Sequence, residues 1–149
     1  MDTYNMIDFN KKKGFICDMD GVIYHGNRVL PGVAEFIQWL HDEDKEYLFL
    51  TNNSGYTPRE LSQKLARMGL DVTEEHFYTS ALATAAFLRD QAPGCSVFAI
   101  GEAGLLNALY DAGITMNDVN PDYVVVGEGR SYSLDTLTKA TNLVWKGAK

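Results

Sequence analysis

The chain has 149 residues, of which 46% are apolar and 22% are charged, and its formal net charge is -7. This size and composition predict a folded globular protein made of one domain or two small ones. No apolar stretch approaches the roughly 20 residues that a membrane-spanning helix needs, and the acidic balance argues against a nucleic-acid partner. Residues 1–10 lack the pattern of a secretory signal, so we expect a cytoplasmic protein.

The first part of the chain predicts alternating strands and helices. Apolar runs predict strands at residues 15–22 and 47–50, and an amphipathic stripe predicts a helix that starts at Pro31. Thr57 and Glu60 form the pattern of a capping box at the start of the next helix. An extended segment follows, and Ser80 is expected to cap a helix over residues 81–90. This order predicts a parallel sheet with right-handed crossovers.

A second α/β unit is expected after the break at Pro93 and Gly94. Strands are predicted at residues 97–100 and 123–126, and helices follow both, the last one capped by Ser133. Both strands end in a Gly-Glu pair, which we interpret as a turn that needs glycine, with a duplicated ligand contact as the alternative.

Two carboxylates, Asp18 and Asp20, interrupt the end of the first predicted strand. Residues two apart on a strand point to the same side, and the carboxyl ends of strands in open α/β sheets are where ligands bind. Like charges placed together are costly, which indicates a metal ion between them or a division into nucleophile and general acid. Gly21 allows the chain to turn away and leaves room for a tetrahedral group. An EF-hand is a poor alternative, because the required spacing fails after Gly21.

A second polar group, Thr51 and Asn52, ends the strand at residues 47–50. A hydroxyl and an amide suit a phosphoryl oxygen without adding negative charge. Taken alone, these residues are typical of an ordinary turn. In a parallel sheet, however, this strand end would lie beside Asp18, so the two groups together predict a phosphate site.

These motifs, with residues 77–85 and 119–128, resemble phosphatases of the haloacid dehalogenase superfamily, and most closely its NagD-like, para-nitrophenyl-phosphatase-like branch. The resemblance extends from Phe15 onward. It implies the N-terminal part of a three-layer, Rossmann-like core with a parallel sheet in residues 1–85, followed by part of a smaller α/β cap domain in residues 86–149. It also implies hydrolysis of a small phosphomonoester, such as a sugar or nucleotide phosphate, through an aspartyl-phosphate.

The resemblance assigns roles to particular residues. Asp18 would be the nucleophile and a ligand of Mg²⁺, and Asp20 the acid/base, with its main-chain carbonyl also on the metal. Thr51, Asn52 and Gly21 would bind the phosphate. We interpret two further residues, listed last, as candidates for substrate contacts from the cap, with a solvated loop as the alternative: Arg130 and Tyr132.

The chain departs from the family's pattern in what it lacks. The lysine that steadies the phosphate and the Gly-Asp motif that completes the metal site in the family find no match, so we expect a partial core with weak or no activity on its own. An open sheet edge would favour pairing with a second copy, as a homodimer. The alternative function is a non-catalytic phospho-aspartate acceptor or interaction module, although an acid two residues after the nucleophile favours turnover.

Overall fold

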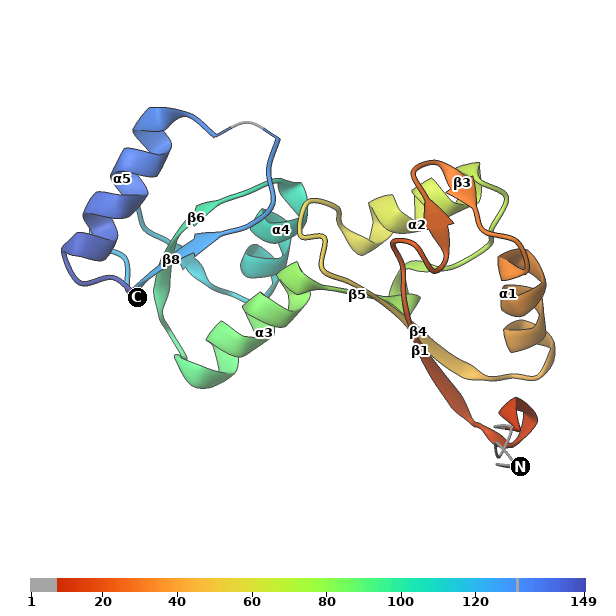
Figure 1. The fold of residues 1–149 in the computed structure, drawn as a ribbon. Coiled ribbons are helices and arrows are strands. Elements are labelled where there is room, and N and C mark those ends of the chain that lie inside the picture. The colour runs from red at the N-terminus through yellow and green to blue at the C-terminus, as the bar shows by residue number, and fades with distance from the viewer. Residues whose placement is uncertain (1–7, 131) are drawn as a thin grey trace, which may run out of the picture.

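The computed structural model describes residues 8–130 and 132–149 and shows two α/β units side by side (Figure 1). The first unit contains, in chain order, η1 (Phe9–Lys11), β1 (Gly14–Asp18), β2 (Tyr24–His25), β3 (Arg28–Val29), α1 (Val33–Asp42), β4 (Glu46–Thr51), α2 (Pro58–Arg67), η2 (Glu74–His76) and β5 (Phe77–Thr79). The second contains α3 (Ser80–Gln91), β6 (Ser96–Ile100), α4 (Ala103–Asp111), β7 (Thr115–Met116), β8 (Tyr123–Val126) and α5 (Leu134–Trp145). None of the helices described is long and apolar enough to cross a membrane.

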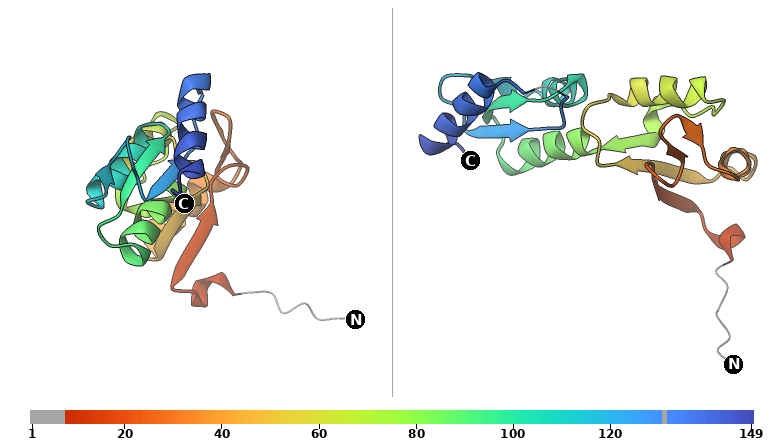
Figure 2. Two further views of the ribbon diagram at one scale, coloured as in Figure 1. Left: turned by 90° about the vertical axis from the view of Figure 1, so that its left-hand side faces the viewer. Right: turned by 45° about the horizontal axis from the view of Figure 1, so that its top comes forward.

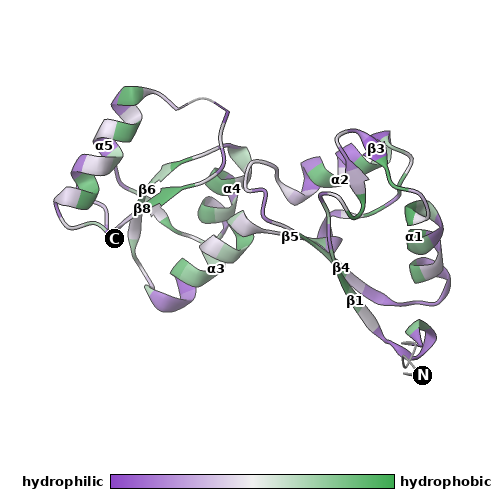
Figure 3. Ribbon diagram, in the orientation of Figure 1, coloured by the Kyte–Doolittle hydropathy of each residue, from purple (hydrophilic) through white to green (hydrophobic). Residues whose placement is uncertain are grey.

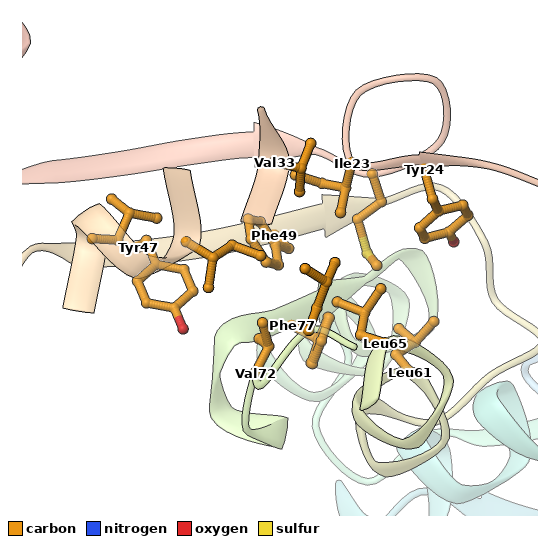
Figure 4. Close-up of a cluster of buried hydrophobic side chains, with 13 residues drawn as sticks. Ile23, Tyr24, Val33, Tyr47, Phe49, Leu61, Leu65, Val72 and Phe77 are labelled. Atoms are coloured by element: carbon orange, nitrogen blue, oxygen red, sulfur yellow. The ribbon is translucent and has the colours of Figure 1, made fainter. Parts of the chain in front are cut away.

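The sheet of the first unit is parallel, as predicted, with strand order β1-β4-β5. Asp18 lies opposite Leu50, and Thr51 lies opposite Thr79, so the carboxyl ends of the three strands meet at one edge. Buried aromatic and aliphatic side chains from the sheet, α1 and α2 form one core around Phe49 (Figure 4). The helices thus hold these strand ends in place from one side.

Among residues 8–130 and 132–149, no helix covers the other face of this sheet. Ile16 on β1 is 72% exposed, and the side chains of Leu50 and Tyr78 are exposed as well. The three-layer core implied by the resemblance is therefore present as two layers within this chain. The apolar run at residues 15–22 is typical of a buried strand, but β1 is not buried, because its alternate residues have no layer to pack against within the described part of the chain.

β1 also ends earlier than predicted, at Asp18 rather than at residue 22. The amides of Ile23 and Tyr24 both turn back to donate hydrogen bonds to the carbonyl oxygen of Met19. Gly21 makes this turn feasible, since its φ of 79° lies in the left-handed region that favours glycine. The apolar residues after Asp20 therefore form a tight turn that leads into the β2–β3 hairpin.

Helix starts follow the sequence closely. Thr57 caps α2 with a complete capping box that includes Glu60, and Ser133 caps α5, both as predicted. The cap of α3 is Thr79 rather than Ser80, so this helix begins one residue earlier than expected. The side chain of Ser80 donates a hydrogen bond to the carbonyl oxygen of Asn52 instead, at 2.8 Å.

The second unit has helices on both faces of its sheet, whose parallel strands lie in the order β7-β6-β8. A core of small and aliphatic residues packs α3 and α4 on one face, while α5 lies on the other, where the ammonium of Lys139 sits 5.2 Å from the centre of the Phe98 ring (Figure 2). Figure 3 shows hydrophobic residues along β6 and β8 and on the helix sides that face them. The strand β7 was not expected from the sequence.

The division between the units lies near Thr79. The predicted boundary after residue 85 falls inside α3, and the residues Ala81, Ala85 and Leu88 of that helix all belong to the core of the second unit. Because α3 is one continuous helix packed on α4, it belongs to the second unit.

Candidate active site

The two carboxylates lie where β1 ends. Oδ1 of Asp18 accepts a hydrogen bond from the amide of Met19 at 2.8 Å, which orients the carboxylate. Within the described residues, Oδ2 of Asp18 receives no hydrogen bond. Asp20 lies beyond the strand and forms an isolated bridge with Tyr24. Both carboxylates are exposed, so a substrate can approach them from solvent.

Tyr24 is a neighbour of Asp20 that the sequence did not single out. It is only 3% exposed, and the ammonium of Lys64 sits 4.0 Å from the centre of its ring. Burial, followed by the charge of Asp20, raises the pKa of Tyr24 to about 12. The phenol therefore stays protonated and can donate to Asp20 at any physiological pH.

Thr51 and Asn52 lie on the neighbouring strand end, as predicted. Thr51 is 5% exposed, and its hydroxyl oxygen accepts a hydrogen bond from the amide of Asn53 at 3.1 Å. Asn52 is exposed, and its carbonyl oxygen is held by Ser80. The register of β1 and β4 brings this loop beside Asp18. The structure thus places a carboxylate pair and a hydroxyl-amide pair together at one sheet edge.

Gly21 does not present a free amide to this edge. Its N–H donates a hydrogen bond to the carbonyl oxygen of Tyr24 at 2.8 Å. The prediction that Gly21 binds phosphate is thus at odds with this geometry, in which its role is to turn the chain. A main-chain amide already bonded within the turn is a poor donor to a ligand, since a new bond would cost the existing one.

Arg130 and Tyr132 lie in the segment after β8. Arg130 approaches the hydroxyl of Tyr56 at 3.4 Å, while the hydroxyl of Tyr132 donates to the carbonyl oxygen of Gly127. Arg130 also lines a polar cleft of about 320 Å³ between the two units. The residues that line this cleft are Asn53, Gly55, Tyr56, Glu60, Glu102, Ala103, Glu128, Gly129 and Arg130. Arg130 is thus placed at a cleft, and Tyr132 braces its own loop.

The donor set at the strand ends fits Mg²⁺. It consists of oxygen atoms, namely the carboxylate of Asp18 and the carbonyl of Asp20, and Mg²⁺ typically takes one or two carboxylates together with waters and phosphate oxygens. Among residues 8–130 and 132–149, no three His, Cys, Asp or Glu side chains gather closely enough to enclose a metal. The arrangement therefore suits a metal whose shell is completed by water and substrate.

Sequence reasoning missed Asn53 and Glu128, which connect the two units. The side-chain amide of Asn53 donates to Oε2 of Glu128 at 2.7 Å, and the main-chain amide of Glu128 donates to the hydroxyl of Ser54 at 2.7 Å. The only indication in the sequence was the repeated Gly-Glu pair, which we had interpreted as a turn requirement. The partners are too far apart in sequence for a local pattern to connect them.

A family model now defines the class of protein. The model for "Haloacid dehalogenase-like hydrolase" matches residues 15–115, which include both strand ends and the joint to the second unit. The chain therefore belongs to the haloacid dehalogenase-like hydrolases, as the motifs implied.

Individual relatives narrow the comparison to NagD-like phosphatases. The chain is 46% identical to the ribonucleotide monophosphatase NagD of Escherichia coli (strain K12), over 92% of its own length and 54% of that protein's, and the solved NagD structure matches with a TM-score of 0.85. It is 44% identical to the dihydroxyacetone phosphatase of Corynebacterium glutamicum (strain R), with 91% and 49% covered. The 4-nitrophenylphosphatase of Thermotoga maritima matches at 34% identity and a TM-score of 0.86, with 94% and 54% covered.

The chain thus spans about half the length of the curated relatives it matches.

Proposed function

We propose that this chain carries the nucleophile half of a Mg²⁺-dependent phosphatase that hydrolyses a small phosphomonoester through an aspartyl-phosphate. The observation that supports this most is the register between β1 and β4, in which Asp18 lies opposite Leu50, so that Asp20 and the pair Thr51 and Asn52 follow at the same end of neighbouring strands. A nucleophile, an acid and two phosphate ligands are what this reaction needs at one place.

The proposed chemistry has two steps. A carboxylate oxygen of Asp18 attacks phosphorus, the bond from phosphorus to the ester oxygen breaks, and Asp20 gives its proton to the leaving alcohol. Asp20, now a carboxylate, then takes a proton from water, which attacks the phosphoryl group and releases inorganic phosphate and Asp18. Tyr24, buried beside Asp20, orients that side chain in both steps. Asp18 and the main-chain carbonyl of Asp20 would hold Mg²⁺, whose positive charge would offset the negative charge of the phosphoryl oxygens.

The substrate class follows from the relatives and from the charge of the chain. Matching proteins carry the names ribonucleotide monophosphatase, dihydroxyacetone phosphatase and acid sugar phosphatase. We therefore propose a small phosphorylated metabolite, a sugar or nucleotide phosphate. Since the chain is acidic, a bound cation is needed to offset its repulsion of an anionic substrate. Arg130, which lines the cleft between the units, is the proposed cap contact with the substrate.

We propose that the 149-residue chain by itself turns over slowly or not at all. It has no match to the lysine and the Gly-Asp motif that the family's pattern implies, and it spans about half of the relatives' length. Clear hydrolysis of small phosphomonoesters by the purified chain, lost in Asp18→Asn, would refute this part of the proposal and leave the assignment of Asp18 intact.

Binding of beryllofluoride tests the site even in a slow enzyme, because this ion mimics a phosphoryl group on a carboxylate. In the presence of Mg²⁺, we expect a bound fluorine resonance with the wild-type chain and none with Asp18→Asn. The exposed Asp42→Asn variant serves as a charge-matched control and should bind like the wild type. Equal binding by Asp18→Asn would contradict the proposed nucleophile.

The alternative function, a phospho-aspartate acceptor that signals rather than turns over, is separated by Asp20→Asn. If the protein is an enzyme, this variant traps the aspartyl-phosphate, because the acid/base that speeds its hydrolysis is gone. A signalling acceptor keeps the same phosphoryl lifetime in the wild type and in the variant. The lifetime after labelling with acetyl phosphate therefore distinguishes the two functions.

We also propose that the isolated chain pairs with a second copy along β1. This strand has one parallel neighbour within the described sheet, and its uncovered face exposes apolar side chains such as Ile16. Light scattering after size exclusion should give the mass of a dimer, and Ile16→Lys should shift it toward the monomer. A wild-type monomer at all concentrations would contradict this.

A further inference from the structure

The two Gly-Glu turns of the second unit lie at the cleft that faces the loop after β4. β6 and β8 are neighbouring parallel strands, with Ile100 opposite Val126, so the pairs that follow them emerge side by side. Both glutamates line the cleft between the units, together with Asn53 of the first unit. The two Gly-Glu pairs therefore lie in the same place as well as having the same sequence.

Glu128 holds the loop after β4 through two separate bonds. Its carboxylate accepts from the side-chain amide of Asn53 at 2.7 Å, and its main-chain N–H donates to the hydroxyl of Ser54 at 2.7 Å. Ser54 is only 6% exposed, so its oxygen is satisfied by this bond in place of water. One residue of the second unit therefore fixes two consecutive residues of the loop.

Asn53 transmits this contact through the loop. Its side-chain oxygen accepts from the amides of Gly55 at 2.9 Å and Tyr56 at 3.1 Å, while its main-chain N–H donates to the hydroxyl of Thr51 at 3.1 Å. With Glu128 binding the nitrogen end of the side-chain amide, the oxygen end can only face the two main-chain amides. The conformation of the loop that carries Thr51 therefore depends on Glu128.

The backbones of the two units lie very close together around this contact. A Cβ atom on Gly104, at the start of α4, would lie 2.5 Å from the carbonyl oxygen of Tyr56 and 2.6 Å from that of Ser54. A Cβ atom on Gly127 would lie 2.9 Å from the hydroxyl of Ser54. The amide of Gly104 also donates to the carbonyl oxygen of Gly55 at 3.0 Å. The second unit thus contacts the loop at two places, Gly104 and Gly127.

We propose that Glu128 is a positioning residue for phosphoryl binding, which acts through Asn53 on the loop that carries Thr51 and Asn52. This inference rests on the proposed function, because it assigns the loop a phosphoryl group to bind. The second unit then does more than cover the strand ends, since it sets the shape of one wall of the site.

Glu102 provides a matched contrast. It follows the same pattern at the end of the adjacent strand, but its carboxylate accepts from the amide of Arg130 at 3.3 Å and makes no hydrogen bond to the loop after β4 within the described residues. Removing Glu102 therefore removes the same charge from the same cleft without touching Asn53.

The experiment compares three variants of the full chain: Glu128→Ala, Glu128→Gln and Glu102→Ala. Hydrogen exchange is measured by NMR at the amides of Gly55 and Tyr56, and beryllofluoride binding is measured with Mg²⁺. In Glu128→Ala, we expect exchange to speed up about tenfold and the affinity to fall by a similar factor. Glutamine keeps a carbonyl oxygen for Asn53 and should restore both, and Glu102→Ala should change neither.

The outcomes separate this proposal from the function on which it rests. Unchanged exchange in Glu128→Ala, or equal losses in Glu128→Gln, overturns the positioning role. Faster exchange with unchanged beryllofluoride affinity overturns it as well, because the loop would then be held for another purpose. A wild-type chain that binds no beryllofluoride refutes the proposed function, and the exchange rates still decide whether Glu128 holds the loop.

Discussion

The two units share one plan and differ in what they place at their strand ends. Each has a three-stranded parallel sheet with helices packed against it, and each aligns its strands so that polar residues emerge at one edge. In the first unit these are Asp18, which is exposed, and Thr51, whose hydroxyl oxygen accepts a hydrogen bond from the amide of Asn53. In the second they are Glu102 and Glu128, which face the first unit. The same architecture thus supplies reactive groups in one case and a contact surface in the other.

The units also differ in how their sheets are covered. The second unit has helices on both faces of its sheet, whereas the first exposes Ile16 and Leu50 on its open face. Large apolar side chains of the second unit are exposed as well, but on its helices, as at Leu134 and Trp145. Because each unit has a buried core of its own, we expect the two units to unfold in separate transitions.

The largest expected effect comes from the core of the less covered unit. Phe49 is fully buried at its centre, so Phe49→Ala should lower the free energy of unfolding by about 3–5 kcal/mol. Trp39 lies in this unit and the exposed Trp145 in the other, which allows Trp39 fluorescence to report on the first unit in a Trp145→Phe background. Denaturant unfolding should show the loss in the Trp39 transition.

The matched control is Leu109→Ala, in the core of the second unit, observed through hydrogen exchange at the amides of α4. Its cost of about 2–5 kcal/mol should appear in the exchange of α4 and not in the Trp39 transition. If both substitutions change both measurements equally, the chain unfolds as one cooperative body, and the expectation of separate transitions is wrong.

A smaller effect is expected where the units touch. Gly104→Ala would ordinarily stabilise a helix by up to about 1 kcal/mol, but here the new methyl group meets main-chain oxygens. We expect it to destabilise the protein by about 1–3 kcal/mol, as overpacking does, and thermal unfolding measures this. Asn107→Ala, at an exposed position of the same helix, should stay within about 0.5 kcal/mol. A stabilised Gly104→Ala would contradict the close approach.

The smallest expected effect concerns how the stability of each unit depends on pH. Burial, followed by the charges of Glu75 and Asp71, raises the pKa of Tyr47 in the first unit to about 12. The unfolded chain therefore loses this proton first, and stability falls as pH rises from about 10 toward 12. Tyr47→Phe should flatten that fall, as measured by the midpoint of urea unfolding across this range.

The stability of the second unit should depend on pH in the acid range instead. Hydrogen bonds from the amide and hydroxyl of Ser96 hold the pKa of Asp122 below its usual 3.8, so its contribution is present at neutral pH and is lost as pH falls below that value. Asp122→Asn should remove this acid dependence. The same slope in the wild type and the variant would show that the link between β6 and β8 carries no stability.

Much of this arrangement could be predicted from local patterns. The cap at Thr57 and the strand that ends at Thr51 follow from side-chain chemistry and apolar runs that involve only neighbouring residues. The end of β1 was predicted too late, because Val22 and Ile23 look like strand residues, whereas the positive φ of Gly21 decides the turn. Local propensity alone does not resolve such a competition.

Other features depend on contacts between distant residues. Asn53 and Glu128 lie 75 positions apart, and nothing near either of them indicates the bond. The boundary at α3 was placed too late for a similar reason, since only the packing of that helix on α4 shows which unit it belongs to. The place of Tyr24 beside Asp20 likewise depends on the turn that Gly21 makes.

The central claim is that Asp18 accepts a phosphoryl group at this sheet edge. It is tested most directly by incubating the Asp20→Asn chain with acetyl phosphate and Mg²⁺ and mapping the added mass by peptide mass spectrometry. We predict a single Mg²⁺-dependent phosphoryl group on Asp18, which is absent when Asp18 is also replaced by asparagine. Labelling at another residue, or equal labelling without Asp18, would contradict the account.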